Sequence, residues 1–102
     1  MKPQVLGISG SPIPHSNTDR LVKAVLDASS LNTEFVKLST MNVRGCVGCL
    51  QCAGDNICKQ ADDFMELGPK VREADALVIG AYTPYASMDS FTKAFLERLF
   101  SF

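Results

Sequence analysis

Apolar residues along the chain form short continuous runs, separated by stretches in which they recur every three or four positions. Residues 4–9 and 76–81 are nearly continuous in apolar side chains, which is typical of buried parallel strands. Residues 33–38 alternate between polar and apolar side chains, which indicates an edge strand. The pattern therefore predicts three strands.

Helical spacing occupies two segments between these strands. A first helix is expected from Ser16 or Asn17, because either residue can cap a helix N-terminus. A second helix is expected over residues 62–74, with the acidic pair Asp62-Asp63 favouring its N-terminus. Gly68-Pro69 is expected to break or kink that helix, because proline removes a backbone N–H.

A third helix is expected after the last strand, from Ser90 to at least Leu99. Phe91, Phe95 and Leu99 lie at four-residue steps and are expected in the core. The charged residues Lys93 and Arg98 are expected to be solvated, with a subunit contact as the alternative for Arg98. The predicted order of elements is therefore strand, helix, strand, loop, helix, strand, helix.

Strands that alternate with helices predict an α/β fold with a doubly wound parallel sheet. Ligands bind such sheets at the carboxyl ends of the strands, where loops 9–17 and 82–89 are expected to meet. The strand at 76–81 would be an exposed apolar edge of a three-stranded sheet, which proteins avoid. We therefore expect residues 1–102 to be the N-terminal part of a single, larger domain.

The composition is ordinary for a soluble globular domain, with 46% hydrophobic and 21% charged residues. A net charge of −1 gives no electrostatic reason to expect a nucleic acid or an anionic membrane as partner. The apolar stretch that follows Gln4 is too short for a signal-peptide core or a membrane span. The expected location is therefore the cytoplasm.

All four cysteines of the chain follow the pattern Cys46-x2-Cys49-x2-Cys52-x5-Cys58, in a loop expected over residues 42–59. Soft thiolates select zinc, Cu(I) or iron–sulfur clusters, and four thiolates are the usual ligands of a 4Fe–4S cluster. Structural zinc sites more often use two widely separated C-x-x-C pairs, and disulfides seldom persist in a reducing compartment. A cluster is therefore the first interpretation, zinc the second and disulfides the third.

The loop after the first strand is dense in hydroxyl and amide side chains. It carries Ser9, Ser11, Ser16, Asn17 and Thr18. It also opens a helix, whose first N–H groups lack partners within the helix and attract anions. These groups suit a phosphate, although no lysine stands where the mononucleotide-binding loop requires one. A plain strand-to-helix turn with a Ser or Asn cap is the alternative.

The strand followed by Gly-Ser-Pro…Ser-Asn-Thr resembles the phosphate loop of flavodoxin-like NAD(P)H-dependent FMN reductases, although Ile13 stands where that family often carries a basic residue. The run Arg44-Gly-Cys-x-x-Cys-x-x-Cys resembles the iron–sulfur flavoprotein branch of the family. The resemblance continues through Thr83-Pro84-Tyr85 and Lys93-Ala-Phe-Leu-Glu-Arg98. It implies a flavodoxin-like doubly wound sheet, truncated here to about three strands and three helices.

The resemblance also implies where the cofactors bind. The FMN phosphate would contact Ser9, Ser11, Pro12, Ser16, Asn17 and Thr18. The isoalloxazine ring would contact Thr83, Pro84, Tyr85, Ala86 and Ser87, with Tyr85 stacking or edging against it. The 4Fe–4S cluster would be bound by Cys46, Cys49, Cys52 and Cys58. The family further implies a homo-oligomer, NAD(P)H or a ferredoxin-type protein as electron donor, and a small-molecule acceptor.

We therefore expect an oxidoreductase that collects electrons on FMN and passes them through the cluster, without a side-chain general base. One alternative is a metal-free NAD(P)H:quinone or FMN reductase whose cysteines are incidental. An alternative of another class is a binding module in which the cysteine loop binds a zinc ion that only stabilises the fold.

Overall fold

Three parallel strands form the central sheet: β1 (Val5–Ser9), β2 (Thr33–Lys37) and β3 (Ala76–Gly80). The computed structural model, which describes residues 3–102, places them in the order β2-β1-β3. Val5 pairs with Thr33 on one side and with Ala76 on the other. The predicted α/β class is confirmed, and the arrangement is that of a truncated flavodoxin-like sheet.

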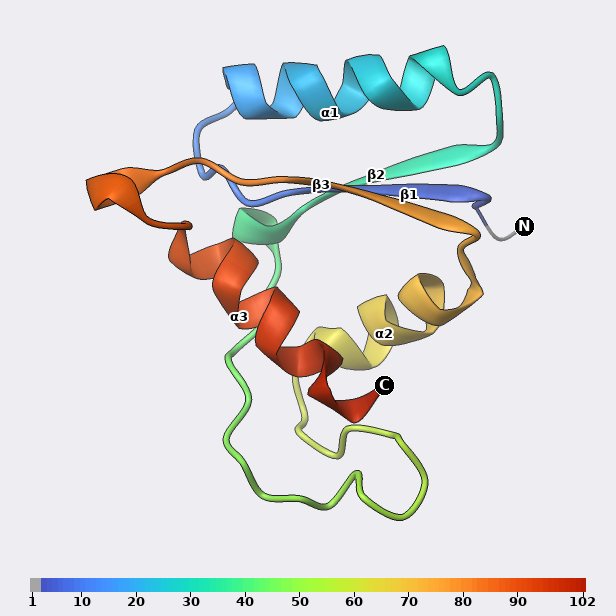
Figure 1. Ribbon diagram of the computed structural model, residues 1–102, viewed down its shortest axis with the longest axis vertical. Helices are drawn as coiled ribbons and strands as arrows, with labels where there is room; N and C mark the ends of the chain where they lie inside the picture. The colour runs from blue at the N-terminus through green and yellow to red at the C-terminus, as the bar shows by residue number, and fades with distance from the viewer. Residues whose placement is uncertain (1–2) are drawn as a thin grey trace.

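Three helices cover the two faces of this sheet (Figure 1). Helix α1 (Asn17–Ala28) lies over one face, whereas α2 (Phe64–Glu73) and α3 (Ser90–Arg98) lie over the other. Short 3-10 turns follow at Leu38–Thr40, Pro84–Ala86 and Leu99–Ser101. The predicted order of strands and helices is confirmed, with bounds that differ by one or two residues.

The alternation of side chains along β1 divides the core in two. Leu6 and Ile8 belong to the larger cluster, on the side of α2 and α3, whereas Val5 packs with residues of α1. Gly7 lies under α1, where a Cβ atom would come within 2.6 Å of Leu26 Cδ1. Glycine is needed at this position because α1 packs so closely against the strand. The larger cluster consists of Leu6, Ile8, Val36, Leu38, Phe64, Leu67, Val71 and Phe95.

Two expectations about local structure have different outcomes. Helix α2 continues through Pro69, so the expected break at Gly68-Pro69 is wrong. The buried side chains of Phe64, Leu67 and Val71 anchor the helix on both sides of the proline, which compensates for the lost backbone bond. The exposed apolar edge is confirmed, since β3 has a free side and Leu77 and Ile79 are both more than one third exposed.

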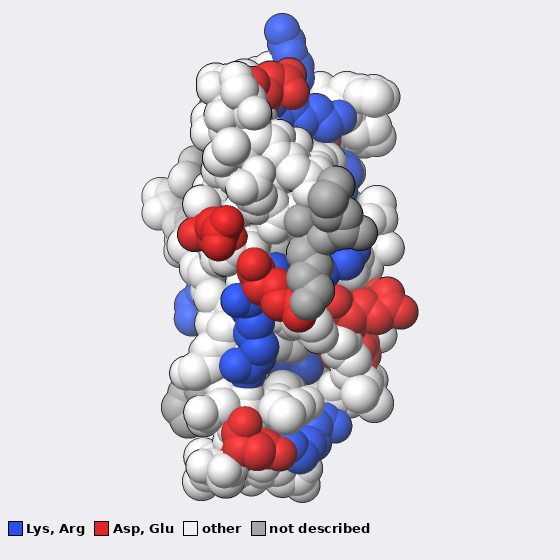
Figure 2. Space-filling model, turned by 90° about the vertical axis from the view of Figure 1, so that its right-hand side faces the viewer, with Lys and Arg blue, Asp and Glu red and all other residues white. Residues whose placement is uncertain are grey.

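The segment between the 3-10 turn after β2 and helix α2 has neither helix nor strand over residues 41–63. It extends below α2 and α3, on the side away from the sheet (Figure 1). Acidic and basic side chains are mixed on the face shown in Figure 2, so that face has no large patch of one sign. Among the described residues, no helix is long and apolar enough to cross a membrane.

Candidate functional site

The loops that follow β1 and β3 meet at the carboxyl edge of the sheet, as the topology predicted. The N–H of Gly10 donates to the carbonyl of Gly80 over 2.9 Å. A Cβ atom on Gly10 would lie 1.9 Å from Thr92 Oγ1 and 2.5 Å from Asp89 Oδ2. Only glycine allows this approach, which joins the first loop to the start of α3.

Asp89 organises the loop after β3. This buried residue caps α3, because its side chain accepts from the Thr92 N–H over 2.9 Å. It also accepts from the Thr92 hydroxyl over 2.8 Å and from the Tyr82 N–H over 3.2 Å. The two ends of the loop are therefore tied together by one carboxylate.

A second buried carboxylate, Asp19, organises the loop after β1. The Ser9 hydroxyl donates to Asp19 Oδ1 over 2.6 Å, and Lys37 Nζ lies 2.6 Å from Asp19 Oδ2. Lys37 also donates to the carbonyl of Ile13 over 2.8 Å. Burial opposes ionisation of Asp19, but the bonds from Lys37 and Ser9 outweigh it and hold the pKa of Asp19 below its usual value.

This network assigns a supporting role to Ser9, one of the residues predicted to bind phosphate. The Ser9 hydroxyl is buried and donates its proton to Asp19. Ser9 therefore stabilises the loop through Asp19 and has no proton left to donate to a phosphate. The part that Asp19 and Lys37 play in this site was not predicted from the sequence. A lone lysine on an alternating strand carries no sequence signal of its own.

The other predicted phosphate ligands lie together at the start of α1. Ser16 is the cap, and its hydroxyl accepts from the Asp19 N–H over 3.1 Å, while the buried Ser11 hydroxyl accepts from the Ile13 N–H over 3.3 Å. A hydroxyl that accepts a bond can still donate its proton to another acceptor. Asn17 is exposed and Thr18 half-buried, in the first turn of α1, and Pro12 is exposed.

The predicted ring-binding segment, residues 83–87, is exposed throughout. Tyr85 has a fully exposed side chain and a φ of 52°, and Ala86 has a φ of 61°. Two consecutive non-glycine residues in the left-handed region are uncommon, and such backbone conformations are found preferentially at ligand sites and switches. Tyr85 therefore projects from the carboxyl edge of the sheet without packing against the core.

The four cysteines line one hollow in the loop below α2 and α3. Cys46 and Cys49 are exposed, Cys52 and Cys58 are half-buried, and all four are free thiols. Among the described residues, no three His, Cys, Asp or Glu side chains are positioned together to hold a metal ion. The chain thus brings the thiols to one side of the loop without placing them at ligand distance.

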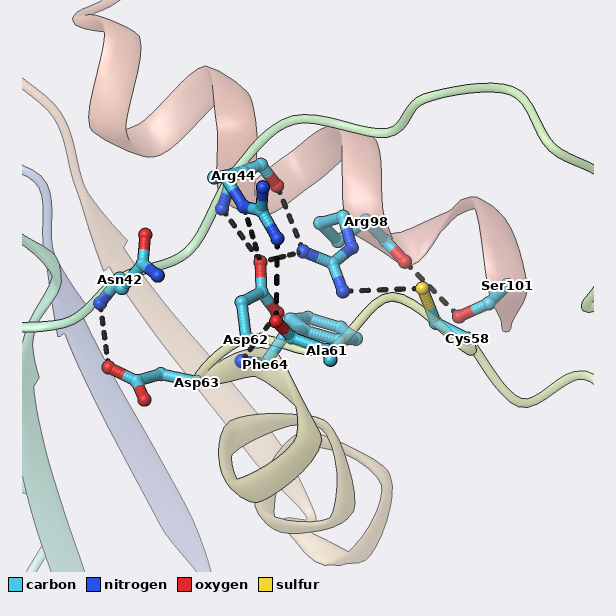
Figure 3. Close-up of polar contacts among 9 residues, drawn as sticks. All are labelled: Asn42, Arg44, Cys58, Ala61, Asp62, Asp63, Phe64, Arg98 and Ser101. Carbon is cyan, nitrogen blue, oxygen red and sulfur yellow. Dashed lines mark hydrogen bonds and ion pairs between the residues drawn. The ribbon is translucent and has the colours of Figure 1, made fainter.

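Arg98 contradicts the expectation that it is solvated, since only 1% of its side chain is exposed. Its guanidinium donates through Nη1 to Asp62 over 2.5 Å and to the Arg44 carbonyl over 3.0 Å, and through Nη2 to Cys58 Sγ over 3.2 Å (Figure 3). A signal was available in the sequence. Position 98 lies three residues after Phe95, on the core-facing side of α3.

Asp62 is the anionic partner of this buried cation. Its fully buried side chain accepts from the N–H of Arg44 over 3.0 Å and from that of Phe64 over 3.1 Å. Burial opposes its ionisation, but the bond from Arg98 and the two backbone bonds prevail, so the pKa of Asp62 lies below its usual value. The bond to Phe64, the first residue of α2, agrees with the expected helix N-terminal role, but Arg98 is the closer partner.

Two buried N–H groups lack a hydrogen-bond partner among the described residues: Gln60 Nε2 and Arg98 Nε. Both residues line the same hollow as the four cysteines. A buried donor without a partner is costly, so it marks a place where an acceptor fits. Four soft thiols, one cation and two unpaired donors together suit an anionic metal–sulfur centre.

Fold and sites together define a flavodoxin-like α/β protein with a polar loop, residues 9–17, at the sheet edge and a separate thiol-rich loop. The chain belongs to the NADPH-dependent FMN reductase family, whose family model matches residues 3–101. This confirms the family resemblance stated from the sequence.

Curated relatives show similarity over nearly the whole chain. It is 34% identical to an iron–sulfur flavoprotein of Methanocaldococcus jannaschii, over 93% of this chain and 51% of the relative. It is 30% identical to an iron–sulfur flavoprotein of Archaeoglobus fulgidus, over 94% and 45%, and 29% identical to one of Methanosarcina thermophila, over 93% and 51%. The chain therefore spans about half the length of these relatives. No solved structure matches it.

Proposed function

We propose that residues 1–102 form the N-terminal, cofactor-binding part of an oxidoreductase domain that uses FMN and a 4Fe–4S cluster. One observation carries the cluster half of this proposal: all four thiols line a single hollow together with Arg98 and the unpaired amide of Gln60. Membership of the FMN reductase family supports the flavin half. When bound, the flavin would exchange electron pairs with a nicotinamide and the cluster would carry single electrons.

The polar loop over residues 9–17 (the anion loop) would hold the FMN phosphate. Its donors are the hydroxyls of Ser11 and Ser16 and the first-turn groups of Asn17 and Thr18, at the positive end of the α1 dipole. Lys37 neutralises Asp19, which would otherwise repel a phosphate at this place. Ser9 supports the loop through Asp19, and Pro12 flanks it.

The segment after β3 would contact the isoalloxazine ring. Thr83, Pro84, Ala86 and Ser87 flank Tyr85 in the chain, and the fully exposed ring of Tyr85 offers an apolar face. Aromatic side chains stack on planar rings with a gain of about 1 kcal/mol beyond area burial. This segment would therefore orient the flavin rather than supply acid–base chemistry.

The cysteine loop would bind the cluster with the thiolates of Cys46, Cys49, Cys52 and Cys58. The Gly48 N–H already donates to Cys46 Sγ over 3.4 Å. Amide donors of this kind raise the reduction potential of a metal–sulfur centre. In one chain, α3 lies between this loop and the anion loop (Figure 1).

The electron donor proposed for the whole protein is NAD(P)H or a ferredoxin-type protein, and the acceptor is a small molecule such as a flavin or quinone. We further propose a cytoplasmic homo-oligomer without a nucleic-acid or membrane partner. These proposals rest on the family to which the chain belongs and on the mixed surface charge.

Anaerobic reconstitution with FMN, iron and sulfide tests the proposal through absorption spectra and metal analysis. Flavin bands with a broad brown shoulder, and four iron atoms per chain as expected for a cubane, would support it. Flavin bands alone would favour the metal-free reductase. A colourless protein with bound zinc would favour the binding module and overturn both.

Two substitutions separate the sites. Cys49→Ser is expected to abolish iron uptake and leave FMN affinity unchanged, whereas the control Ala53→Ser in the same loop should retain both. Loss of both cofactors in Cys49→Ser would contradict the assignment of separate loops. Ser11→Ala should weaken FMN binding by about 1 kcal/mol. The control Ser29→Ala, at the other end of α1, should leave FMN affinity unchanged.

A further inference from the structure

Arg98 joins the two ends of the cysteine loop to helix α3. Its guanidinium bonds the carbonyl of Arg44, two residues before the first cysteine, and the sulfur of Cys58, the last cysteine. Asp62 reinforces this junction, because it accepts from the Arg44 N–H as well as from Arg98. The base of the loop is thus fixed to the folded core although the loop itself has no regular structure (Figure 3).

The charge at this junction is balanced before any cofactor binds. Arg98 and Asp62 are both buried and form a close ion pair, so their charges cancel locally. Arg98 nevertheless keeps an unpaired N–H at Nε, and its Nη2 bond goes to Cys58 Sγ rather than to Asp62. Arg98 therefore lines the hollow where the thiols gather and donates a hydrogen bond to one of them.

We propose that Arg98 is a positioning residue that holds Cys58 as the fourth ligand and stabilises the reduced form of the bound cluster. This inference rests on the proposed function. One electron delivered from reduced flavin adds one negative charge to the cluster and its thiolates, with no bond formed or broken in the protein. A buried guanidinium bonded to a ligand sulfur stabilises that added charge, so it raises the reduction potential.

Arg98→Lys is the central test, because lysine retains the positive charge but cannot bond Asp62, Arg44 and Cys58 in one planar fork. The control is Arg20→Lys, the same chemical change at an exposed position on α1, on the opposite face of the sheet. Both variants are reconstituted anaerobically beside the wild-type chain. Iron content, FMN content and the midpoint potential of the cluster are measured, the last by a dithionite titration followed by electron paramagnetic resonance.

In Arg98→Lys, the ratio of reduced to oxidised cluster at a fixed potential is expected to fall about tenfold, which is 59 mV for a one-electron couple. Loss of iron with FMN retained would equally support the proposal, because it would show that Cys58 needs Arg98 to bind. Arg20→Lys is expected to behave as the wild type does. A wild-type iron content and midpoint potential in Arg98→Lys would overturn the inference and leave the proposed function standing.

A double variant, Arg98→Gln with Asp62→Asn, removes both charges at once and so leaves no unpaired buried ion. Because the two charges cancel locally, it is expected to lower the midpoint potential or the iron content as Arg98→Lys does, through the lost bond to Cys58. Unfolding of both Arg98 variants with loss of FMN would assign the residue to the core alone and overturn the inference. Absence of iron from the wild-type chain itself would overturn the proposed function, and the inference with it.

Discussion

The anion loop and the cysteine loop both gather polar side chains, but only the anion loop is fully built by the chain. Next to the anion loop, the buried residues Ser9 and Asp19 form a network with the half-buried Lys37 of β2, and Gly10 of the loop is bonded to Gly80. In the cysteine loop, residues 42–59, two of the thiols are exposed, as are the three large apolar side chains that stand between them. These apolar residues are Val47, Leu50 and Ile57.

The two sites would therefore obtain their binding geometry in different ways. The anion loop is pre-organised, so a phosphate would bind to a shape that already exists. The cysteine loop is fixed only at its base, by Arg98 and Asp62. A metal–thiolate centre binds far more strongly than any contact in this loop, so binding would itself fold the loop. Substitutions should therefore affect the two loops very differently in the metal-free chain.

The largest expected effect is that of Gly10→Ala, where a Cβ atom would overlap Thr92 Oγ1. Overpacking of this kind should lower the free energy of unfolding by ~3 kcal/mol, measured by urea denaturation. The matched control is Gly54→Ala in the cysteine loop, where a Cβ atom would meet nothing within 4 Å. That control should change stability by less than about 0.5 kcal/mol. Equal effects of the two substitutions would remove the contrast between the loops.

A smaller loss is expected for Asp19→Asn, which removes the charge that pairs with Lys37. The free energy of unfolding at neutral pH should fall by ~2 kcal/mol, as for other hydrogen bonds to charged groups. The control Asp27→Asn changes an exposed carboxylate of the same helix and should have an effect within about 0.5 kcal/mol. A wild-type stability for Asp19→Asn would show that the network contributes nothing.

The same carboxylate gives the stability a pH dependence. The pKa values of Asp19 and Asp62 are both lowered in the folded chain from an ordinary value of 3.8. Their contribution is therefore complete above about pH 3.8, and is lost as the pH falls through the lower, folded-state pKa values. Melting temperatures from pH 7 to pH 2 should fall more steeply in this acid range for the wild type than for Asp19→Asn. Parallel curves would contradict the assignment.

The smallest effect is expected for Cys46→Ser in the metal-free chain. Its thiol is exposed, so the free energy of unfolding should change by less than about 0.5 kcal/mol. After reconstitution with iron and sulfide, the wild-type loop should resist trypsin and the Cys46→Ser loop should not. A loss of more than about 1 kcal/mol in the metal-free variant would show that the chain organises this loop without metal.

Much of the fold was determined by local sequence pattern. The runs at residues 4–9 and 76–81 and the alternation at 33–38 predicted all three strands. This was possible because the burial of a strand shows in the order of apolar and polar residues along the strand itself. Family motifs around Gly10 and Cys46 then placed the chain in the FMN reductase family, which the family model confirms. The break at Pro69 was mispredicted because core contacts of α2 override the local preference of proline.

Only the tertiary structure decided which charged side chains are buried and what they hold. Arg98 pairs with Asp62 across 36 positions, and Lys37 pairs with Asp19 across 18. No periodicity links residues so far apart, since their meeting depends on how α3 and β2 pack against the rest of the chain. The sequence determined the elements and the spacing of the four cysteines. The fold alone determined that one buried arginine fastens the cysteine loop to the core, because burial of a charge is decided by packing and not by local pattern.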